Sequence, residues 1–388
     1  MQAQVVRLSE GARPQRSQPS SRPTRAEVDL GAMAHNLGLM REVARGSRLY
    51  AVVKADAYGH GLVPVARWLE RHAVDGLCVA LAEEGLALRA CGVTVPILVL
   101  SGAYGDTHDR VIAAHLTPVV YSLAQVRAFN RAAAGRPVGV HLKVDTGMGR
   151  LGVLPEELLE LVDALRELPN VRLDGVMTHF SSADSDPVFT AAQLERFEAA
   201  LGAIRARGFS PRWVHAANSA GTFLFPAARF DLVRVGLALY GVPPSPEQGA
   251  ELRPAMSLRS EVLALRDLPA GSAVGYDQTY RTTRPSRIAT IPIGYGDGLL
   301  RAASNRGAML VRGRRCPIVG RVSMDLTTLD VTEATDCAVG DEVMVLGQQG
   351  DEQITAHELA RACETIAYEV LTNISPRVPR IYTGDDAQ

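Results

Sequence analysis

Between Leu49 and Gly236, hydrophobic positions follow two alternating patterns. Short runs rich in β-branched residues alternate with segments in which apolar residues recur at spacings of three and four. The first pattern is typical of buried strands and the second of amphipathic helices. The strand-like runs number eight and cover residues 49–55, 76–81, 96–101, 117–122, 138–145, 174–180, 212–218 and 231–236. Eight strand and helix units in this order predict a parallel, TIM-like (β/α)8 barrel.

After Pro254 the pattern changes to strands and turns without long helices between them. Strand-like runs cover residues 256–268, 287–295, 308–331 and 341–347, and a helical stretch follows at His357–Val370. We expect Glu27–Leu30 to add a strand to this β-rich region. The first 25 residues are rich in Arg, Gln, Ser and Pro and lack the apolar run of a signal peptide. We therefore expect a disordered tail at 1–25, a barrel at 26–252 and a mostly-β domain at 253–388.

The composition is that of a soluble globular enzyme rather than a disordered or fibrous chain. Of the 388 residues, 47% are hydrophobic and 21% are charged, and the formal net charge is -1. This balance argues against nucleic-acid binding, and no window approaches the ~20 apolar residues of a membrane-spanning helix. The five cysteines are scattered without a C-x-x-C pair. We expect reduced thiols, no metal site and a cytoplasmic location.

Polar residues cluster where the predicted barrel strands end, which is the face on which such barrels place their chemistry. Lys54 closes the first strand, Arg150 follows the fifth and His179 closes the sixth. The turns Asn218–Gly221 and Val235–Leu237 follow the seventh and eighth strands. These are the loops that often present backbone N–H groups to a phosphate. The clustering therefore predicts a site for a phosphate-bearing cofactor.

Each of these residues also has a structural interpretation. Lys54 could be a solvated charge at a strand end, His179 a hydrogen-bonded core histidine, and Asp145 a residue that holds its loop, which we favour for Asp145. Arg234 lies within the apolar run Leu232–Leu239, so its guanidinium must find a partner. A lysine at the barrel mouth, two phosphate-type loops and a nearby arginine together favour a Schiff-base cofactor, with pyridoxal phosphate the leading choice. The residues by themselves do not name the substrate.

Several longer runs resemble the motifs of alanine racemases. The run AVVKADAYGHG at Ala51–Gly61 is similar to the lysine signature of that family. Further runs follow in order, namely HLKVDTGMGRLG, MTHFSSAD, HAANSAG, DLVRVGLALYG, VGYDQTY, IPIGYGDG, GRVSMD and YEVLTNISPRVPR, so that the resemblance spans Asp29–Tyr382. It implies an enzyme that interconverts L-alanine and D-alanine with pyridoxal 5'-phosphate and supplies D-alanine for peptidoglycan. It also implies a homodimer with shared active sites.

The resemblance assigns roles to individual residues. It implies that Lys54 forms the internal aldimine and that Tyr276 is the opposing base. Arg234 would bond the pyridine nitrogen beside His179, and Arg150 would reach the phenolic oxygen and the substrate carboxylate. The remaining residues it implicates are Tyr58, Asn218, Ser219, Gly236, Leu237 and Tyr368 for the cofactor, Met324 and Tyr295 for the substrate, and Lys143 and Asp325 in support. One departure is Ser323, where some family members have Cys.

Three alternatives remain at this stage. A serine or broad-specificity racemase would use the same scaffold, because a small pocket rejects an added hydroxyl only weakly. Decarboxylases of similar architecture place an acidic residue in an E-P-G-R loop against the pyridine nitrogen, and Arg234 argues against them. Single-barrel cofactor carriers lack a second domain and thus any equivalent of Tyr276. For Lys143, the resemblance suggests carbamylation, whereas an ion pair with Asp145 is the simpler alternative.

Overall fold

The computed structural model describes residues 22–244 and 251–384, which divide into two compact units. The barrel unit contains Glu27–Ser257, Thr355–Ile374 and the described residues from Tyr382 onward. The β unit contains the described residues up to Ala26, Leu258–Ile354 and Ser375–Ile381. The barrel unit thus includes a segment, Thr355–Ile374, that follows the β-rich region in sequence. No helix in the described part of the chain is long and apolar enough to cross a membrane.

Eight parallel strands form the barrel, as the hydrophobic pattern predicted. They are β2 (Arg48–Val52), β3 (Gly76–Val79), β4 (Ile97–Val99), β5 (Thr117–Val120), β6 (Val138–Lys143), β7 (Val171–Met177), β8 (Trp213–His215) and β9 (Leu232–Val235). Their order is sequential from β2 to β8, and β9 pairs with β2. The N–H of Asp231 donates to the carbonyl of Val214 at 3.1 Å, and the N–H of Arg234 donates to the carbonyl of Ala217 at 3.0 Å. These two bonds join the segments of β8 and β9. The barrel is therefore nearly closed, and the predicted fold class is confirmed.

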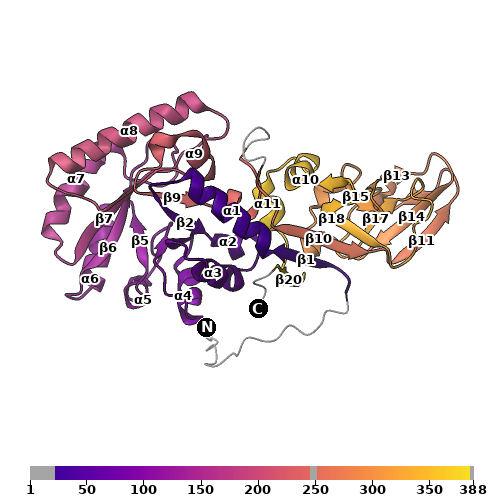
Figure 1. Ribbon diagram of the computed structural model, residues 1–388, viewed down its shortest axis with the longest axis horizontal. Helices are drawn as coiled ribbons and strands as arrows, with labels where there is room; N and C mark the ends of the chain where they lie inside the picture. The colour runs from indigo at the N-terminus through magenta and orange to yellow at the C-terminus, as the bar shows by residue number, and fades with distance from the viewer. Residues whose placement is uncertain (1–21, 245–250, 385–388) are drawn as a thin grey trace, which may run out of the picture. The chain divides into compact units, whose positions relative to one another are not determined.

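Helices alternate with these strands, and the longer ones cover the outside of the barrel (Figure 1). They are α1 (Leu30–Val43), α2 (Lys54–Tyr58), α3 (Leu62–Arg71), α4 (Ala82–Ala90), α5 (His108–Ala113), α6 (Leu123–Ala132), α7 (Pro155–Ala164), α8 (Pro187–Ala206) and α9 (Ser219–Leu224). The sequence pattern missed α1, which begins where the carboxylate of Asp29 accepts from the N–H of Ala32 at 3.0 Å. The helical stretch predicted at His357–Val370 is two helices, α10 (Ala356–Ala362) and α11 (Ala367–Thr372).

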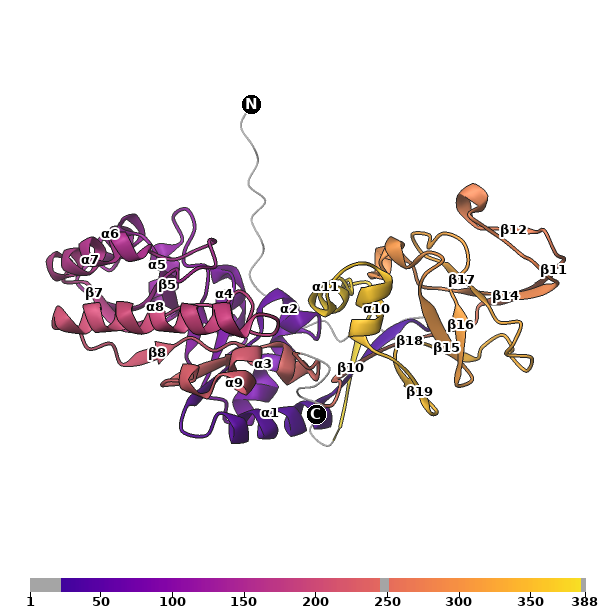
Figure 2. The same ribbon diagram turned by 90° about the horizontal axis from the view of Figure 1, so that it is seen from above.

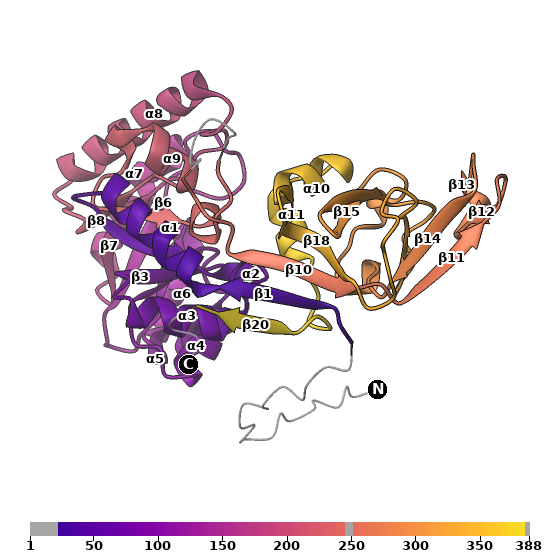
Figure 3. The same ribbon diagram turned by 45° about the vertical axis from the view of Figure 1, so that its right-hand side comes forward.

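The remaining described strands form three sheets. The strands are β1 (Arg25–Asp29), β10 (Met256–Glu261), β11 (Ala264–Leu268), β12 (Ala273–Val274), β13 (Tyr280–Arg281), β14 (Ser286–Ile291), β15 (Ala308–Val311), β16 (Arg314–Pro317), β17 (Thr327–Asp330), β18 (Glu342–Gln349), β19 (Glu352–Ile354) and β20 (Arg380–Thr383). The largest sheet has the order β16-β15-β18-β10-β1-β20, with β19 paired to β18. Figure 3 shows β10, β1 and β20 side by side, and Figure 2 shows β11 alongside β14 of the sheet β11-β14-β17.

The strand expected near the N-terminus is present as β1, between β10 and β20. It begins at Arg25, so the tail predicted for residues 1–25 extends too far. Thr24 is buried, and its hydroxyl donates to the carbonyl of Pro292 at 2.6 Å. Arg22 pairs with the buried carboxylate of Asp297 at 2.8 Å. Residues 1–21 lie outside the described residues, so that part of the prediction stays a prediction.

Candidate active site

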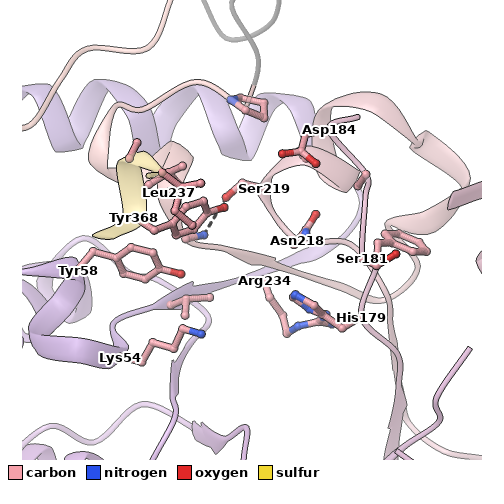
Figure 4. Close-up of a pocket in the computed structure, with 18 of the residues that line it drawn as sticks. Lys54, Tyr58, His179, Ser181, Asp184, Asn218, Ser219, Arg234, Leu237 and Tyr368 are labelled. Atoms are coloured by element: carbon pink, nitrogen blue, oxygen red, sulfur yellow. Dashed lines mark hydrogen bonds between the residues drawn. The ribbon is translucent and has the colours of Figure 1, made fainter. Parts of the chain in front are cut away.

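A cavity of about 590 Å³ lies at the carboxyl ends of the barrel strands, and its described lining belongs to the barrel unit. All ten residues predicted to bind the cofactor line it, namely Lys54, Tyr58, Arg150, His179, Asn218, Ser219, Arg234, Gly236, Leu237 and Tyr368. Figure 4 shows Lys54 and Tyr58 on one side of this cavity and His179 and Arg234 on another. The grouping follows from topology, because parallel strands bring their carboxyl ends to one face.

Lys54 begins a turn with an unusual backbone. The four residues after it, Ala55 to Tyr58, all have positive φ angles between 52° and 56°. They form one left-handed turn, a conformation that costs L-residues about 1–2 kcal/mol each. The turn ends at Gly59, whose φ is 81° and where a Cβ would lie 2.2 Å from the carbonyl oxygen of Leu371. Backbone strain of this kind is concentrated at functional sites, where the surrounding structure must hold it.

The charges around Lys54 work in opposite directions. Burial lowers the pKa of Lys54, and the positive fields of Arg150 and Arg234 lower it further. The carboxylate of Glu84 favours the ammonium form and raises the pKa. A lysine must lose its proton to act as a nucleophile or a base. The surroundings of Lys54 therefore favour the reactive amine, with Glu84 as a counterweight.

Arg234 is buried on β9 and donates to neutral acceptors. Its Nη1 lies 2.8 Å from Nδ1 of His215, and its Nη2 lies 2.8 Å from the carbonyl oxygen of Thr178 and 3.0 Å from that of Ala216. Nη2 also lies 3.2 Å from Nδ1 of His179. Burial lowers the pKa of Arg234 to about 10. The guanidinium therefore stays charged at neutral pH without a carboxylate partner among the described residues.

Two buried histidines continue this network inside the barrel. Nε2 of His215 lies 2.8 Å from Nδ1 of His141. Because a guanidinium has only donors, Nδ1 of His215 must accept from Arg234, and neutral His215 then donates from Nε2 to His141. Burial and Arg234 hold the pKa of His215 well below its usual value, and burial lowers that of His141 to about 4. Both rings are neutral at physiological pH, and the chain of hydrogen bonds fixes Arg234 in place.

A second group of cavity residues provides neutral donors. The hydroxyl of Ser219, at the start of α9, accepts from the N–H groups of Gly236 at 3.0 Å and Ala238 at 3.3 Å. A Cβ on Gly236 would lie 2.6 Å from the hydroxyl oxygen of Tyr58, so a side chain there would fill the space between them. The Tyr58 ring lies 5.9 Å from that of Tyr368. The hydroxyl groups of Ser219 and Tyr58 can donate to a phosphate at the start of α9.

Near the end of β6, Asp145 holds its loop. Its carboxylate accepts from the N–H groups of Gly147 (2.9 Å), Met148 (2.9 Å) and Gly149 (2.9 Å), which confirms the structural interpretation. These bonds lower the pKa of Asp145 against the opposing effect of burial. Lys143 is buried, and no ion pair joins it to Asp145 within the described ranges. Burial, Arg234 and Arg150 lower the pKa of Lys143 to about 8.

Four predicted residues, Tyr276, Tyr295, Met324 and Asp325, lie in the β unit. Tyr276 is 69% exposed between strands β12 and β13. Tyr295 and Met324 are also exposed, and their segments are joined by a hydrogen bond from the N–H of Gly296 to the carbonyl of Met324 at 2.8 Å. Asp325 accepts from Arg377 at 2.6 Å.

The sequence carries one further signal, which concerns its lysines. Lys54 and Lys143 are the only two lysines among the 41 Lys and Arg residues of the chain. Arginine serves every other cationic position, so these two positions are set apart as ones where an amine is used. Tyr240 and Glu84 were missed, because no local pattern in the sequence marks either residue. The hydroxyl of Tyr240 donates to the carbonyl of Val52 at 2.9 Å, and the carboxylate of Glu84 accepts from the N–H of Ala55.

Two family models together match most of the chain. The model of the alanine racemase N-terminal domain matches residues 28–244, and that of the alanine racemase C-terminal domain matches residues 255–382. The chain belongs to the alanine racemase family. The family expected from the sequence motifs is thereby confirmed.

Curated alanine racemases and their solved structures resemble the chain over almost their full length. The alanine racemase of Sorangium cellulosum is 47% identical and the match covers 93% of this chain and 99% of that protein. That of Symbiobacterium thermophilum is 45% identical, with 94% and 98% covered. The structure of the Streptomyces lavendulae enzyme gives a TM-score of 0.90 at 39% identity, with 94% and 98% covered. That of the Bacillus anthracis enzyme, with bound L-Ala-P, gives 0.89 at 37% identity, with 95% and 97% covered.

Membership in this family also confirms the expected enzyme class and cofactor. The chain is a pyridoxal-phosphate-dependent racemase with the barrel and the mostly-β region that its relatives share.

Proposed function

We propose that the chain interconverts L-alanine and D-alanine through two bases, Lys54 on one face of the substrate and Tyr276 on the other. The observation that supports this most is the convergence of Lys54, Arg234 and Ser219 on one cavity of the barrel unit. Lys54 supplies an amine, Arg234 a hydrogen-bond donor that keeps its proton, and Ser219 a hydroxyl that can bind a phosphate. Their combination matches the chemistry of an amino-acid racemase better than that of a decarboxylase, which needs an acid where Arg234 lies.

The residues of the cavity fit pyridoxal 5'-phosphate. Lys54 would hold its carbonyl carbon, Ser219, Gly236 and Tyr58 would hold its phosphate, and Arg234 would donate to its ring nitrogen. Among the described residues, no acceptor bonds Nε of Arg234, which leaves this N–H available. When bound, the cofactor draws electrons from the α-carbon and acidifies its hydrogen. A guanidinium gives up no proton near neutral pH, so Arg234 limits that withdrawal and favours clean return of the proton.

Racemisation needs proton transfer on both faces of the α-carbon. One base removes the hydrogen from one face, and a second base delivers a proton to the opposite face. Lysine and tyrosine have reference pKa values of ~10.4 and ~10, so each must be tuned to act near neutrality. For Lys54, burial and the fields of Arg150 and Arg234 lower the pKa in the required direction. Arg150 would also bind the substrate carboxylate with the backbone of Met324.

The cavity's own tyrosines are poor candidates for the second base. Tyr58 and Tyr368 line the cavity, but burial raises the pKa of both. A raised pKa disfavours the phenolate that would accept a proton. We therefore assign the second base to Tyr276, which in one chain is too exposed to work as a buried catalytic group.

We further propose that two chains pair and share their active sites. Tyr276, Tyr295 and Met324 are exposed large side chains of the β unit, and exposed side chains of this kind are available for contact with a partner. A twofold pairing that places this surface over the partner's cavity would create two identical composite sites from one repeated contact. Free cysteines at all five positions agree with a reducing, cytoplasmic location, where the product would serve peptidoglycan synthesis.

The direct test is chiral chromatography of the purified protein with L-alanine. Because enantiomers have equal free energy, D-alanine should accumulate until the two forms are equal. L-serine should react more slowly, and a rate equal to or above that of alanine would favour the broad-specificity alternative. In the same preparation, borohydride reduction and peptide mass spectrometry should find the pyridoxyl group on Lys54 and not on Lys143. Absence of D-alanine would contradict the proposal.

We also propose that Lys143 is carbamylated. Its buried side chain has a pKa lowered to about 8, so the neutral amine is more available than in an ordinary lysine. The amine nitrogen would form a bond to the carbon of CO2, one C–O π bond would break to give the carboxylate oxygen, and the nitrogen would lose a proton to solvent. Asp145 is occupied by three backbone N–H groups. The resulting anion, rather than Asp145, would then orient Arg150.

A Lys143→Ala variant should lose much of its activity and regain part of it with acetate, because a small carboxylate can occupy the space of the lost carbamate. Chloride at the same ionic strength should give no recovery. In the unmodified chain, ¹³C-bicarbonate should produce a carbamate NMR signal that disappears in Lys143→Ala. Lack of both the signal and the acetate effect would leave Lys143 as a buried amine only.

A further inference from the structure

We infer that Glu84 is a positioning residue for Lys54: its carboxylate fixes the left-handed turn that begins at the lysine and places a negative charge opposite the ammonium group. Glu84 lies in the first turn of α4 and is not among the residues that line the cavity. It would therefore act through Lys54 and not on the substrate. This inference rests on the assignment of Lys54 as the reactive amine.

The Glu84 carboxylate accepts hydrogen bonds from two separate segments. Oε1 accepts from the N–H of Ala55 at 2.7 Å, and Ala55 is the first left-handed residue of the turn. Oε2 accepts from the N–H groups of Ala80 at 2.8 Å and Leu81 at 3.0 Å, directly after β3. One carboxylate thus ties the residue next to Lys54 to the end of the neighbouring strand.

The contact between Glu84 and Ala55 opposes backbone strain in the turn. Within the turn, the N–H of Ala57 donates to the carbonyl of Val53 and that of Gly59 to the carbonyl of Ala55. These bonds use no N–H of Ala55, so Glu84 supplies the acceptor that an isolated turn would lack. A run of left-handed L-residues persists only where neighbours hold it. Without Glu84, the turn could relax and carry Lys54 away from its place.

Glu84 also acts on Lys54 through its negative charge. The groups that act on the Lys54 ammonium are Arg150 and Arg234, which disfavour it, and Glu84 and Cys78, which favour it. Lys143 also interacts with Lys54 as a like charge. Burial raises the pKa of Cys78 to about 12, so that thiol is neutral at physiological pH. Glu84 is therefore the anion that balances two guanidinium groups at the reactive amine.

The two roles can be separated by substitution. Gln at position 84 removes the charge, and its single carbonyl oxygen can satisfy the N–H groups on one side only. Asp at position 84 keeps the charge but shortens the reach to Ala55. Glu83→Gln is the matched control, because Glu83 is the exposed preceding residue of the same helix turn and loses the same charge.

The decisive readout does not require racemase activity. The full chain stripped of cofactor would be treated with acetic anhydride over a range of pH, and peptide mass spectrometry would follow acetylation of Lys54. The presence of only two lysines makes the two products easy to distinguish. Glu84→Gln should shift the Lys54 profile to lower pH by on the order of one unit, because an anion that favours the ammonium has been lost. Glu83→Gln should leave the profile in place.

In the holoenzyme, Glu84→Gln and Glu84→Asp should both lower kcat by roughly tenfold, with KM nearly unchanged, because the lysine is misplaced while the groups that bind the substrate are intact. The inference would be overturned if Glu84→Gln and Glu83→Gln had the same pH profile of Lys54 acetylation and the same kcat. It would also be overturned if Glu84→Gln lowered only the melting temperature and left the acetylation profile and kcat unchanged. If Glu84→Gln does not fold, the test uses Glu84→Asp with Glu83→Asp as its control. Equal kcat values for these two variants would overturn the inference. Failure of the function proposal would instead abolish turnover in every variant and leave the Lys54 shift intact.

Discussion

Mixed dimers of Lys54→Ala and Tyr276→Ala chains are expected to recover about half of wild-type activity per dimer, although each variant alone is nearly inactive. If one chain gives Lys54 and its partner gives Tyr276, the mixed dimer contains one site with both bases and one with neither. A site that lacks both bases is little less active than a site that lacks one, because the two bases act as a unit. The intact site should therefore work at its normal rate while its neighbour is silent.

The measurement requires co-expression with two different tags and purification through both. Doubly tagged Lys54→Ala homodimers serve as the control, because they contain no intact site in any arrangement. Activity restricted to the mixed preparation would place the two bases on different chains. Mixed dimers as inactive as their parents would contradict a shared site and leave the family assignment as it is.

Replacement of Arg234 by Glu is expected to lower racemisation by roughly 10²-fold or more and to raise the proportion of alanine that transfers its amino group to the bound cofactor and leaves as pyruvate. Arg234 donates to His215, Thr178, Ala216 and His179 and has no carboxylate partner among the described residues. A carboxylate at this position would accept instead of donate and would favour a protonated ring nitrogen. Electron withdrawal from the α-carbon would then increase, and with it the side reactions that Arg234 suppresses.

The ratio of pyruvate to D-alanine formed is the quantity to measure, since it is independent of the amount of folded enzyme. Arg205→Glu is a suitable control, because Arg205 is exposed on α8 and undergoes the same change of charge. A buried carboxylate close to two carbonyl oxygens should also destabilise the chain, so melting temperature should be recorded. An unchanged ratio would show that Arg234 has only a structural role.

The sequence by itself determined the barrel and the position of its reactive face. The eight strand-like runs agree with β2 to β9 because burial on both sides of a parallel strand leaves a local, continuous apolar signal. Lys54, His179 and Ser219 could be placed at the cavity because each lies at the end of a predicted strand or directly after it, and parallel strands share one carboxyl face. The family motifs then gave the enzyme class and cofactor, since they extend over almost the whole chain.

Only the tertiary structure decided how that face is supported. The link from Arg234 through His215 to His141 joins β9, β8 and β6, and no local pattern indicates which buried histidines will meet. The left-handed turn after Lys54 contains no glycine before Gly59, so the usual sequence sign of positive φ angles was missing. Its conformation depends on Glu84, 29 residues away from Ala55 in the chain, and on the close approach of Leu371. Contacts between distant segments arise from the packing of whole elements, which hydrophobic periodicity cannot specify.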